Sequence, residues 1–164
     1  MTDVVFGELR KEEDYGWWGR QTMEFGGNTF TMELLIRQGK DDEIKEIQKK
    51  AFQSFMEKWP QLQTGLIEAL IKYYNEEEYY SYGPEDEEEA AEWWPEIETR
   101  EALLQAVTLE TIVIPQDFIM DRRGRRVYLL FSRTWGGEDL DDNGIGVSYT
   151  NEALDEIAYK DIAF

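Results

Sequence analysis

The spacing of the apolar residues changes along the chain, and this change most limits the fold. Between Trp17 and Phe25, and again from Phe30 to Ile36, apolar and polar residues alternate with a period of two, as in strands with one buried face. Gly26-Gly27-Asn28 separates the two segments, which favours a β-hairpin. With an earlier strand expected at residues 4–10, the first third predicts a β-meander.

The middle of the chain has helical spacing. From Ile44 onward apolar residues recur every three or four positions, which indicates an amphipathic helix with Asp41 or Asp42 as a candidate N-cap. Pro60 interrupts this pattern. Because proline is favoured in the first turn of a helix, we predict that a second helix begins there and continues to Tyr74.

The last third returns to strand patterns after a short helix that carries Ala102 to Val107, with Thr99 as its N-cap. Four segments predict a second meander: residues 111–114, 127–131, 145–149 and 154–164. Strands at both ends with helices between them are typical of the α+β class. We therefore predict one domain over residues 1–164, in which N- and C-terminal β-meanders form an antiparallel sheet and two or three central helices pack on one face.

The chain contains neither histidine nor cysteine. This absence excludes Ser-His-Asp and Cys-His nucleophile systems, the usual zinc and haem ligand sets, disulfides and a histidine pH switch. Carboxylates are the one acid–base group present in quantity. We therefore predict a protein that is not an enzyme and that binds no cofactor or metal ion.

The charge balance is strongly acidic, with 17 Lys and Arg against 36 Asp and Glu and a formal net charge of −19. Such a charge repels phosphate backbones and anionic lipid surfaces and attracts basic proteins. No segment approaches the length of a membrane span, and the first eight residues lack the features of a signal peptide. We expect a cytoplasmic protein with a basic protein partner and no direct contact with nucleic acid or membrane; its oligomeric state stays open.

Residues 76–98 form the most acidic segment and contain no basic residue. The tyrosines at 79, 80 and 82 and the tryptophans at 93 and 94 predict that at least the ends of this segment pack on the domain. Clustered carboxylates next to aromatic rings are also typical of a docking surface. The candidate partner-binding residues are Glu85, Asp86, Glu87, Glu88, Glu89, Glu92, Trp93 and Trp94. The alternative is a solvated acidic loop with buried aromatic ends.

A loop near residue 140 matches the first half of a calcium-binding loop. Its candidate oxygen ligands are Asp139, Asp141 and Asn143, followed by Gly144. The twelfth position holds Thr150 where a bidentate glutamate is needed, and the flanking segments resemble strands. A polar loop between two strands is therefore the stronger interpretation.

Arg122-Arg123-Gly124-Arg125-Arg126 concentrates positive charge in front of a predicted strand. We interpret it as a solvated β-turn whose arginines relieve the negative charge locally. The alternatives are a site that holds an anion or one that pairs with the acidic segment.

The C-terminal half resembles a known family. A strand ends at Trp135, a loop rich in Gly, Asp and Glu follows, Gly144-Ile145-Gly146-Val147 opens the next strand, and the last strand ends near Asp161. The helical residues that match are Gln48, Phe52, Phe55, Leu70, Tyr73 and Tyr74. Over residues 45–162 this pattern is similar to an uncharacterised bacterial domain family often found near polymorphic toxin systems. The resemblance implies an α+β domain of immunity-protein type without known enzymatic activity.

These observations support one leading hypothesis and two alternatives. The leading one is a cytoplasmic inhibitor that neutralises a basic toxin, such as a nuclease, by covering its substrate site with carboxylates that mimic phosphates. The first alternative is a DNA mimic, which requires regular rows of acids along an elongated face. The second is a carboxylate-dependent or calcium-assisted hydrolase, which requires facing carboxylates in a cleft.

Overall fold

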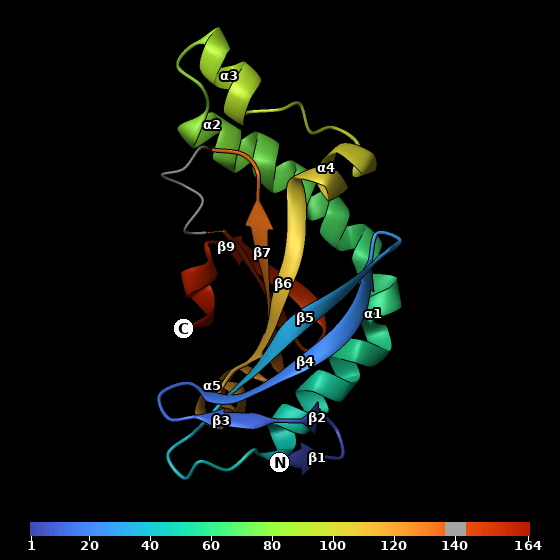
Figure 1. Ribbon diagram of the computed structural model, residues 1–164, viewed down its shortest axis with the longest axis vertical. Helices are drawn as coiled ribbons and strands as arrows, with labels where there is room; N and C mark the ends of the chain where they lie inside the picture. Colours follow the sequence, from blue (N-terminus) through green and yellow to red (C-terminus); the bar gives the residue numbers. More distant parts are fainter. Residues whose placement is uncertain (137–143) are drawn as a thin grey trace.

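The computed structural model describes residues 1–136 and 144–164, and its centre is a seven-stranded sheet (Figure 1). The sheet strands are β3 (Arg10–Glu12), β4 (Gly16–Phe25), β5 (Asn28–Arg37), β6 (Val107–Ile114), β7 (Arg126–Arg133), β8 (Ile145–Thr150) and β9 (Ala153–Ala158). They lie in chain order, and neighbours are antiparallel except β5 and β6, which are parallel. Two meanders therefore meet at one parallel pair, and the predicted α+β class is confirmed.

One long helix covers a face of the sheet, and the shorter helices lie around its ends. The helical segments are α1 (Glu46–Tyr73), the π-helix η1 (Tyr74–Glu78), α2 (Tyr79–Tyr82), α3 (Glu87–Trp93), α4 (Arg100–Ala106), α5 (Asp117–Arg123) and the 3-10 helix η2 (Lys160–Ala163). A small hairpin of β1 (Thr2–Asp3) and β2 (Gly7–Glu8) precedes the sheet. Figure 1 shows α1 along the sheet, with α2 and α3 beyond its upper end.

The predicted hairpin is present as β4 and β5, and its turn consists of two residues, because Asn28 already belongs to β5. Phe25 pairs with Asn28, while Gly26 and Gly27 adopt left-handed φ angles of 62° and 90°. Both residues of such a turn favour glycine because L side chains are strained there. A Cβ atom at Gly26 would also lie 2.5 Å from the side chain of Leu104, so the turn packs tightly against α4.

The main hydrophobic core lies between α1 and the sheet, and aromatic side chains form its centre. Phe55 is fully buried; its ring centroid lies 5.5 Å from that of Trp59 on the same helix and 5.1 Å from that of Tyr149 in β8. The ring centroids of Phe25 in β4 and Phe131 in β7 lie 5.5 Å apart. Residues from both meanders and from α1 therefore share one core.

The prediction that a second helix begins at Pro60 is wrong, because α1 passes through this residue. A proline inside a helix costs about 3 kcal/mol. The buried stripe stays in phase on both sides of it, with Trp59 before and Leu66 after. Burial of each large apolar side chain contributes about 1.5–3 kcal/mol, so these two residues offset the cost of the proline.

The predicted start of α1 is also wrong. Neither Asp41 nor Asp42 is the N-cap; the helix begins at Glu46, and the side chain of Gln48 accepts a hydrogen bond of 2.9 Å from the backbone N–H of Lys45. The buried Gln48 amide also donates to the carbonyls of Arg37 and Pro115, both at 2.8 Å. Gln48 therefore joins the start of α1 to the ends of β5 and β6.

The other predicted boundaries of helices and strands agree in part with the structure. Thr99 caps α4 as predicted, since its hydroxyl accepts a hydrogen bond of 3.2 Å from the N–H of Ala102, but Val107 belongs to β6. The expected strand at residues 4–10 is only two short pieces, β2 and the start of β3. The expected last strand ends at Ala158, and the 3-10 helix η2 follows it.

The interpretation of the arginine-rich motif as a solvated turn is wrong. Arg122 and Arg123 end the unpredicted helix α5, where cations complement the helix dipole. Arg125 makes two hydrogen bonds of 3.0 and 2.9 Å with Glu152, which raises the pKa of its guanidinium. Arg126 is buried in β7, donates to the Ser148 hydroxyl at 2.7 Å and lies 3.6 Å from Asp155. Arg125 and Arg126 therefore connect the start of β7 to β8, to β9 and to the turn between them.

In the described ranges, no helix is both long enough and apolar enough to cross a bilayer.

Burial raises the pKa of four tyrosines above the ordinary value of 10.0: Tyr73, Tyr74, Tyr149 and Tyr159. The unfolded chain releases these protons near pH 10, whereas the folded chain retains them, so the free energy of unfolding falls as pH rises above about 10. We expect the buried Tyr149 to add about 1.4 kcal/mol per pH unit to this fall. Tyr149→Phe removes a hydroxyl with no hydrogen-bond partner among the described residues and should make the decline shallower. Urea titrations from neutral to alkaline pH measure it; equal slopes for both proteins would contradict the prediction.

Candidate functional site

We define the acidic protrusion as residues 76–93. It begins in η1, includes α2 and α3, and projects past the end of the sheet (Figure 1). No basic residue occurs between Lys72 and Arg100, so its negative charge has no compensating cation within the segment. This end of the molecule therefore carries the densest negative charge of the sequence.

An aromatic cluster holds the protrusion to the core. Tyr74 is its centre: its ring centroid lies 4.8 Å from Trp135, 6.0 Å from Tyr79 and 6.1 Å from Trp94. The Tyr74 hydroxyl donates a hydrogen bond of 2.6 Å to the carbonyl of Pro95. Edge-to-face and tilted ring pairs at these distances add about 0.5–1.5 kcal/mol each beyond their buried area. The chain therefore leaves the core after Tyr74 and returns to the core at Trp94, whose ring packs beside that of Tyr74.

The structure brings the six predicted acids together on α3 and the residues that lead into it. Asp86 is the N-cap of α3, since its carboxylate accepts a hydrogen bond of 2.8 Å from the N–H of Glu89. Glu89 is partly buried and accepts a hydrogen bond of 3.0 Å from the N–H of Glu85. Side chains at the remaining positions are exposed: Glu85, Glu87, Glu88 and Glu92. Acidic groups in the first turn also complement the positive end of the helix dipole.

Trp94, one of the predicted partner-binding residues, is buried in this structure. Its side chain is only 4% exposed because it packs on Tyr74 and on Tyr79, 5.7 Å away. Trp93 is partly buried, and its carbonyl accepts a hydrogen bond of 3.0 Å from Gly136. Trp93 therefore keeps a partly accessible ring at the edge of the acids, whereas Trp94 belongs to the core.

Two tyrosines of the protrusion are exposed. Tyr80 is 87% exposed and Tyr82 is 51% exposed, so the predicted packing of the ends of this segment does not extend to these two rings. A signal was present, because Tyr74 and Glu78 continue the buried stripe of α1 and Tyr80 lies outside that stripe. The protrusion therefore presents acidic and aromatic groups side by side.

The π-helical turn η1 joins α1 to the protrusion and buries an ion pair. Residues five apart in an α-helix point about 140° away from each other. In the wider π-helical turn, the Tyr73 hydroxyl instead donates to Oε1 of Glu78 at 3.0 Å. The same oxygen accepts from the guanidinium of Arg133 in β7, and both side chains are almost completely buried. Single π-helical turns are frequent at functional sites.

Sequence reasoning missed this ion pair. Glu78 lies inside a run of acids and resembles its exposed neighbours Glu76 and Glu77, and Arg133 is 55 residues away. The one available signal is its spacing of four residues from the apolar Tyr74, which places it on the buried stripe.

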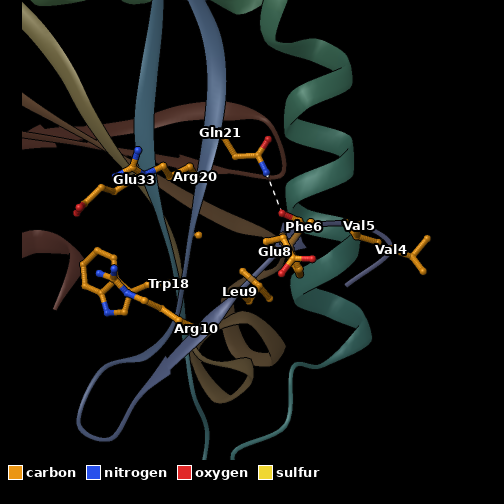
Figure 2. A pocket seen from close by; sticks show the side chains of 12 residues that line it. Val4, Val5, Phe6, Glu8, Leu9, Arg10, Trp18, Arg20, Gln21 and Glu33 are labelled. Atoms are coloured by element: carbon orange, nitrogen blue, oxygen red, sulfur yellow. Dashed lines mark hydrogen bonds between the residues drawn. The ribbon is translucent and has the colours of Figure 1, made fainter. Parts of the chain in front are cut away.

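A cavity with a volume of about 710 Å³ lies at the opposite end of the molecule, between the β1–β2 hairpin and β4 (Figure 2). In Figure 2 the Gln21 amide reaches the Phe6 carbonyl across a hydrogen bond of 3.1 Å. The charged lining residues are Glu8, Arg10, Arg20 and Glu33. Two acids and two bases cancel, so this cavity has no preference for ions of either sign.

Within the described ranges, no group of three or more Asp and Glu side chains is arranged to hold a metal ion. The candidate calcium ligands Asp139, Asp141 and Asn143 lie outside the described residues.

Comparison with known protein families identifies the family of this chain. The model of a domain of unknown function, DUF6985, matches residues 5–164. The chain belongs to the DUF6985 family. No curated protein and no solved structure matches the chain. The description of DUF6985 names neither a reaction nor a partner, so the resemblance to immunity-type domains stays a prediction.

The buried ion pair predicts a large difference between neighbouring glutamates. We expect Glu78→Gln to lower the free energy of unfolding by about 3 kcal/mol, because the buried guanidinium of Arg133 loses this carboxylate. The matched control Glu77→Gln changes an exposed side chain and should stay within about 0.5 kcal/mol of the unmodified protein. Urea denaturation followed by circular dichroism measures both, and equal stabilities would contradict the prediction.

Proposed function

We propose that this protein binds a basic protein partner through the acidic protrusion and acts as its inhibitor. The observation that carries this proposal is the pairing of exposed carboxylates with the exposed rings of Tyr80 and Tyr82 on one projecting element. The inhibitory role comes from the resemblance to immunity-type domains. A cytoplasmic toxin with a basic substrate site is the kind of partner that this role implies.

Charge supports the first stage of binding. Exposed carboxylates on α3 add to a net charge of −19, and the segment contains no cation of its own. Such an electrostatic field raises the association rate with an oppositely charged protein about 10- to 1,000-fold. Salt weakens the attraction, because the Debye length is about 10 Å at an ionic strength of 0.1 M. The acids therefore steer a basic partner to this end of the molecule.

The aromatic rings support the second stage. Tyrosine supplies a large contact area at a small entropic cost and is enriched among the residues that dominate binding energy. Tyr80 and Tyr82 project from α2, whose base is fixed by the ring contacts of Tyr79 with Tyr74 and Trp94. A basic partner held by the carboxylates would therefore meet rings on a supported element, and the rings also attract cations through their faces.

The proposal predicts that charge position matters more than total charge. We expect a fluorescent deca-lysine peptide to bind the protein, with an affinity that falls between about 0.05 M and about 0.2 M NaCl. Replacing Glu85, Glu88 and Glu92 with glutamine should weaken this binding about tenfold, because it removes carboxylates from the docking surface. Fluorescence anisotropy titrations measure the affinity.

The matched control replaces three exposed glutamates elsewhere, Glu13, Glu57 and Glu68, and changes the net charge by the same amount. Its affinity for deca-lysine should stay within about twofold of the unmodified protein. If both triple variants weaken binding equally, the peptide responds to total charge alone and the proposed docking surface is wrong.

A further inference from the structure

One edge of the sheet is only partly covered. β4 runs to Phe25, but β3 pairs only with its first residues, and the last of these pairs joins Arg10 to Trp18. In the described part of the chain, no strand pairs with this side of β4 beyond Trp18. The β1–β2 hairpin stands apart from it, across the cavity of about 710 Å³ (Figure 2). We call residues 19–25 of β4 the open edge, which is long enough to pair with another strand.

The register of the β4–β5 hairpin determines which backbone groups the open edge presents. Phe25 and Asn28 flank the two-residue turn, and such a pair exchanges backbone hydrogen bonds. Because hydrogen-bonded pairs alternate along an antiparallel ladder, the odd-numbered residues bond to β5 and the even-numbered residues direct their N–H and C=O groups outward. The outward residues of the open edge are Arg20, Thr22 and Glu24. One of their carbonyls is already used, because that of Glu24 accepts a hydrogen bond of 2.6 Å from the Trp59 indole.

The side chains of these three residues lie on one face of β4, and their charges are self-complementary. Arg20, Thr22 and Glu24 are all exposed, and neither charged group forms an ion pair within the described residues. If two β4 strands pair antiparallel around Thr22, each Arg20 faces Glu24 of the other copy and the two threonines face each other. Opposite charges and threonine pairs at directly opposed positions stabilise a strand pair. A two-fold axis at Thr22 produces each contact twice, as in other symmetric dimers.

We infer that a second copy of this chain binds at the open edge of β4 and forms a two-fold dimer with one continuous sheet. In this dimer the two Thr22 residues exchange backbone hydrogen bonds, and each Glu24 N–H donates to the Arg20 carbonyl of the other copy. Free edges pair readily with other strands, and the charges on this edge restrict which strand fits. The inference is independent of the proposed function, because the protrusion lies beyond the end of the sheet, away from the open edge (Figure 1).

Sedimentation equilibrium of the full chain tests for the dimer. An ionic strength of about 0.15 M suits the measurement, because the Debye length of about 8 Å then screens the repulsion between two chains of net charge −19. We expect a reversible dimer with a Kd below about 0.1 mM. A chain that stays monomeric at about ten times that concentration would overturn the inference.

Charge reversals test the register. Arg20→Glu places two carboxylates opposite each other at both ends of the paired segment, and Glu24→Arg does the same with two guanidinium groups. Either change alone should raise the dimer Kd at least about tenfold, because like charges at opposed positions destabilise a strand pair. An equimolar mixture of the two variants should regain the affinity of the unmodified protein, because every pair in the mixed dimer joins opposite charges. That recovery also shows that both variants are folded.

Total charge predicts a different pattern. Glu24→Arg lowers the net negative charge by two, which would strengthen a dimer that responds to overall repulsion alone, whereas the proposed register predicts weaker binding. Unchanged affinity in both single variants, or no recovery in the mixture, would overturn the interface. The triple variant at Glu85, Glu88 and Glu92 should still dimerise, so a failure of the dimer and a failure of the proposed function are seen in separate measurements.

Discussion

The buried ion pair between Glu78 and Arg133 is the constraint on which the acidic end of this protein depends. It joins the last turn of a long helical segment to a central strand, and the π-helical turn places Glu78 beside Tyr73. Buried charges are stable only when their partners are held in place, so this pair fixes where the core ends. The aromatic rings around Tyr74 then hold the returning chain, and the residues between them project away from the sheet.

The two ends of the molecule differ in chemistry because of this arrangement. At the N-terminal end, two acids and two arginines balance each other around the cavity between the β1–β2 hairpin and β4. At the other end, the protrusion has carboxylates without basic neighbours in its own segment, and exposed tyrosines. A rigid sheet and helix thus support an element with little buried surface of its own. Function is expected on such an element, because its side chains need not serve the core.

Patterns of apolar residues predicted most of the fold. The β4–β5 hairpin followed from strict alternation and a Gly-Gly turn, and the central strands followed from short apolar runs. Pro60 was misleading because a single residue type was given more weight than the phase of the stripe around it. In the candidate site, the clustering of six acids on and before α3 was predicted, but the burial of Trp94 and the exposure of Tyr80 were not. Burial of those rings depends on contacts with Tyr74 and the rest of the fold, which a local pattern does not contain.

We propose that a basic partner binds at the acidic protrusion rather than over the surface as a whole. Amide hydrogen exchange of the full chain, with and without a saturating deca-lysine peptide, locates the residues that such a partner covers. Exchange should slow within residues 76–93 and stay unchanged around β1, β2 and β4. Slowed exchange spread evenly over the exposed acids, or concentrated at the N-terminal cavity, would contradict it.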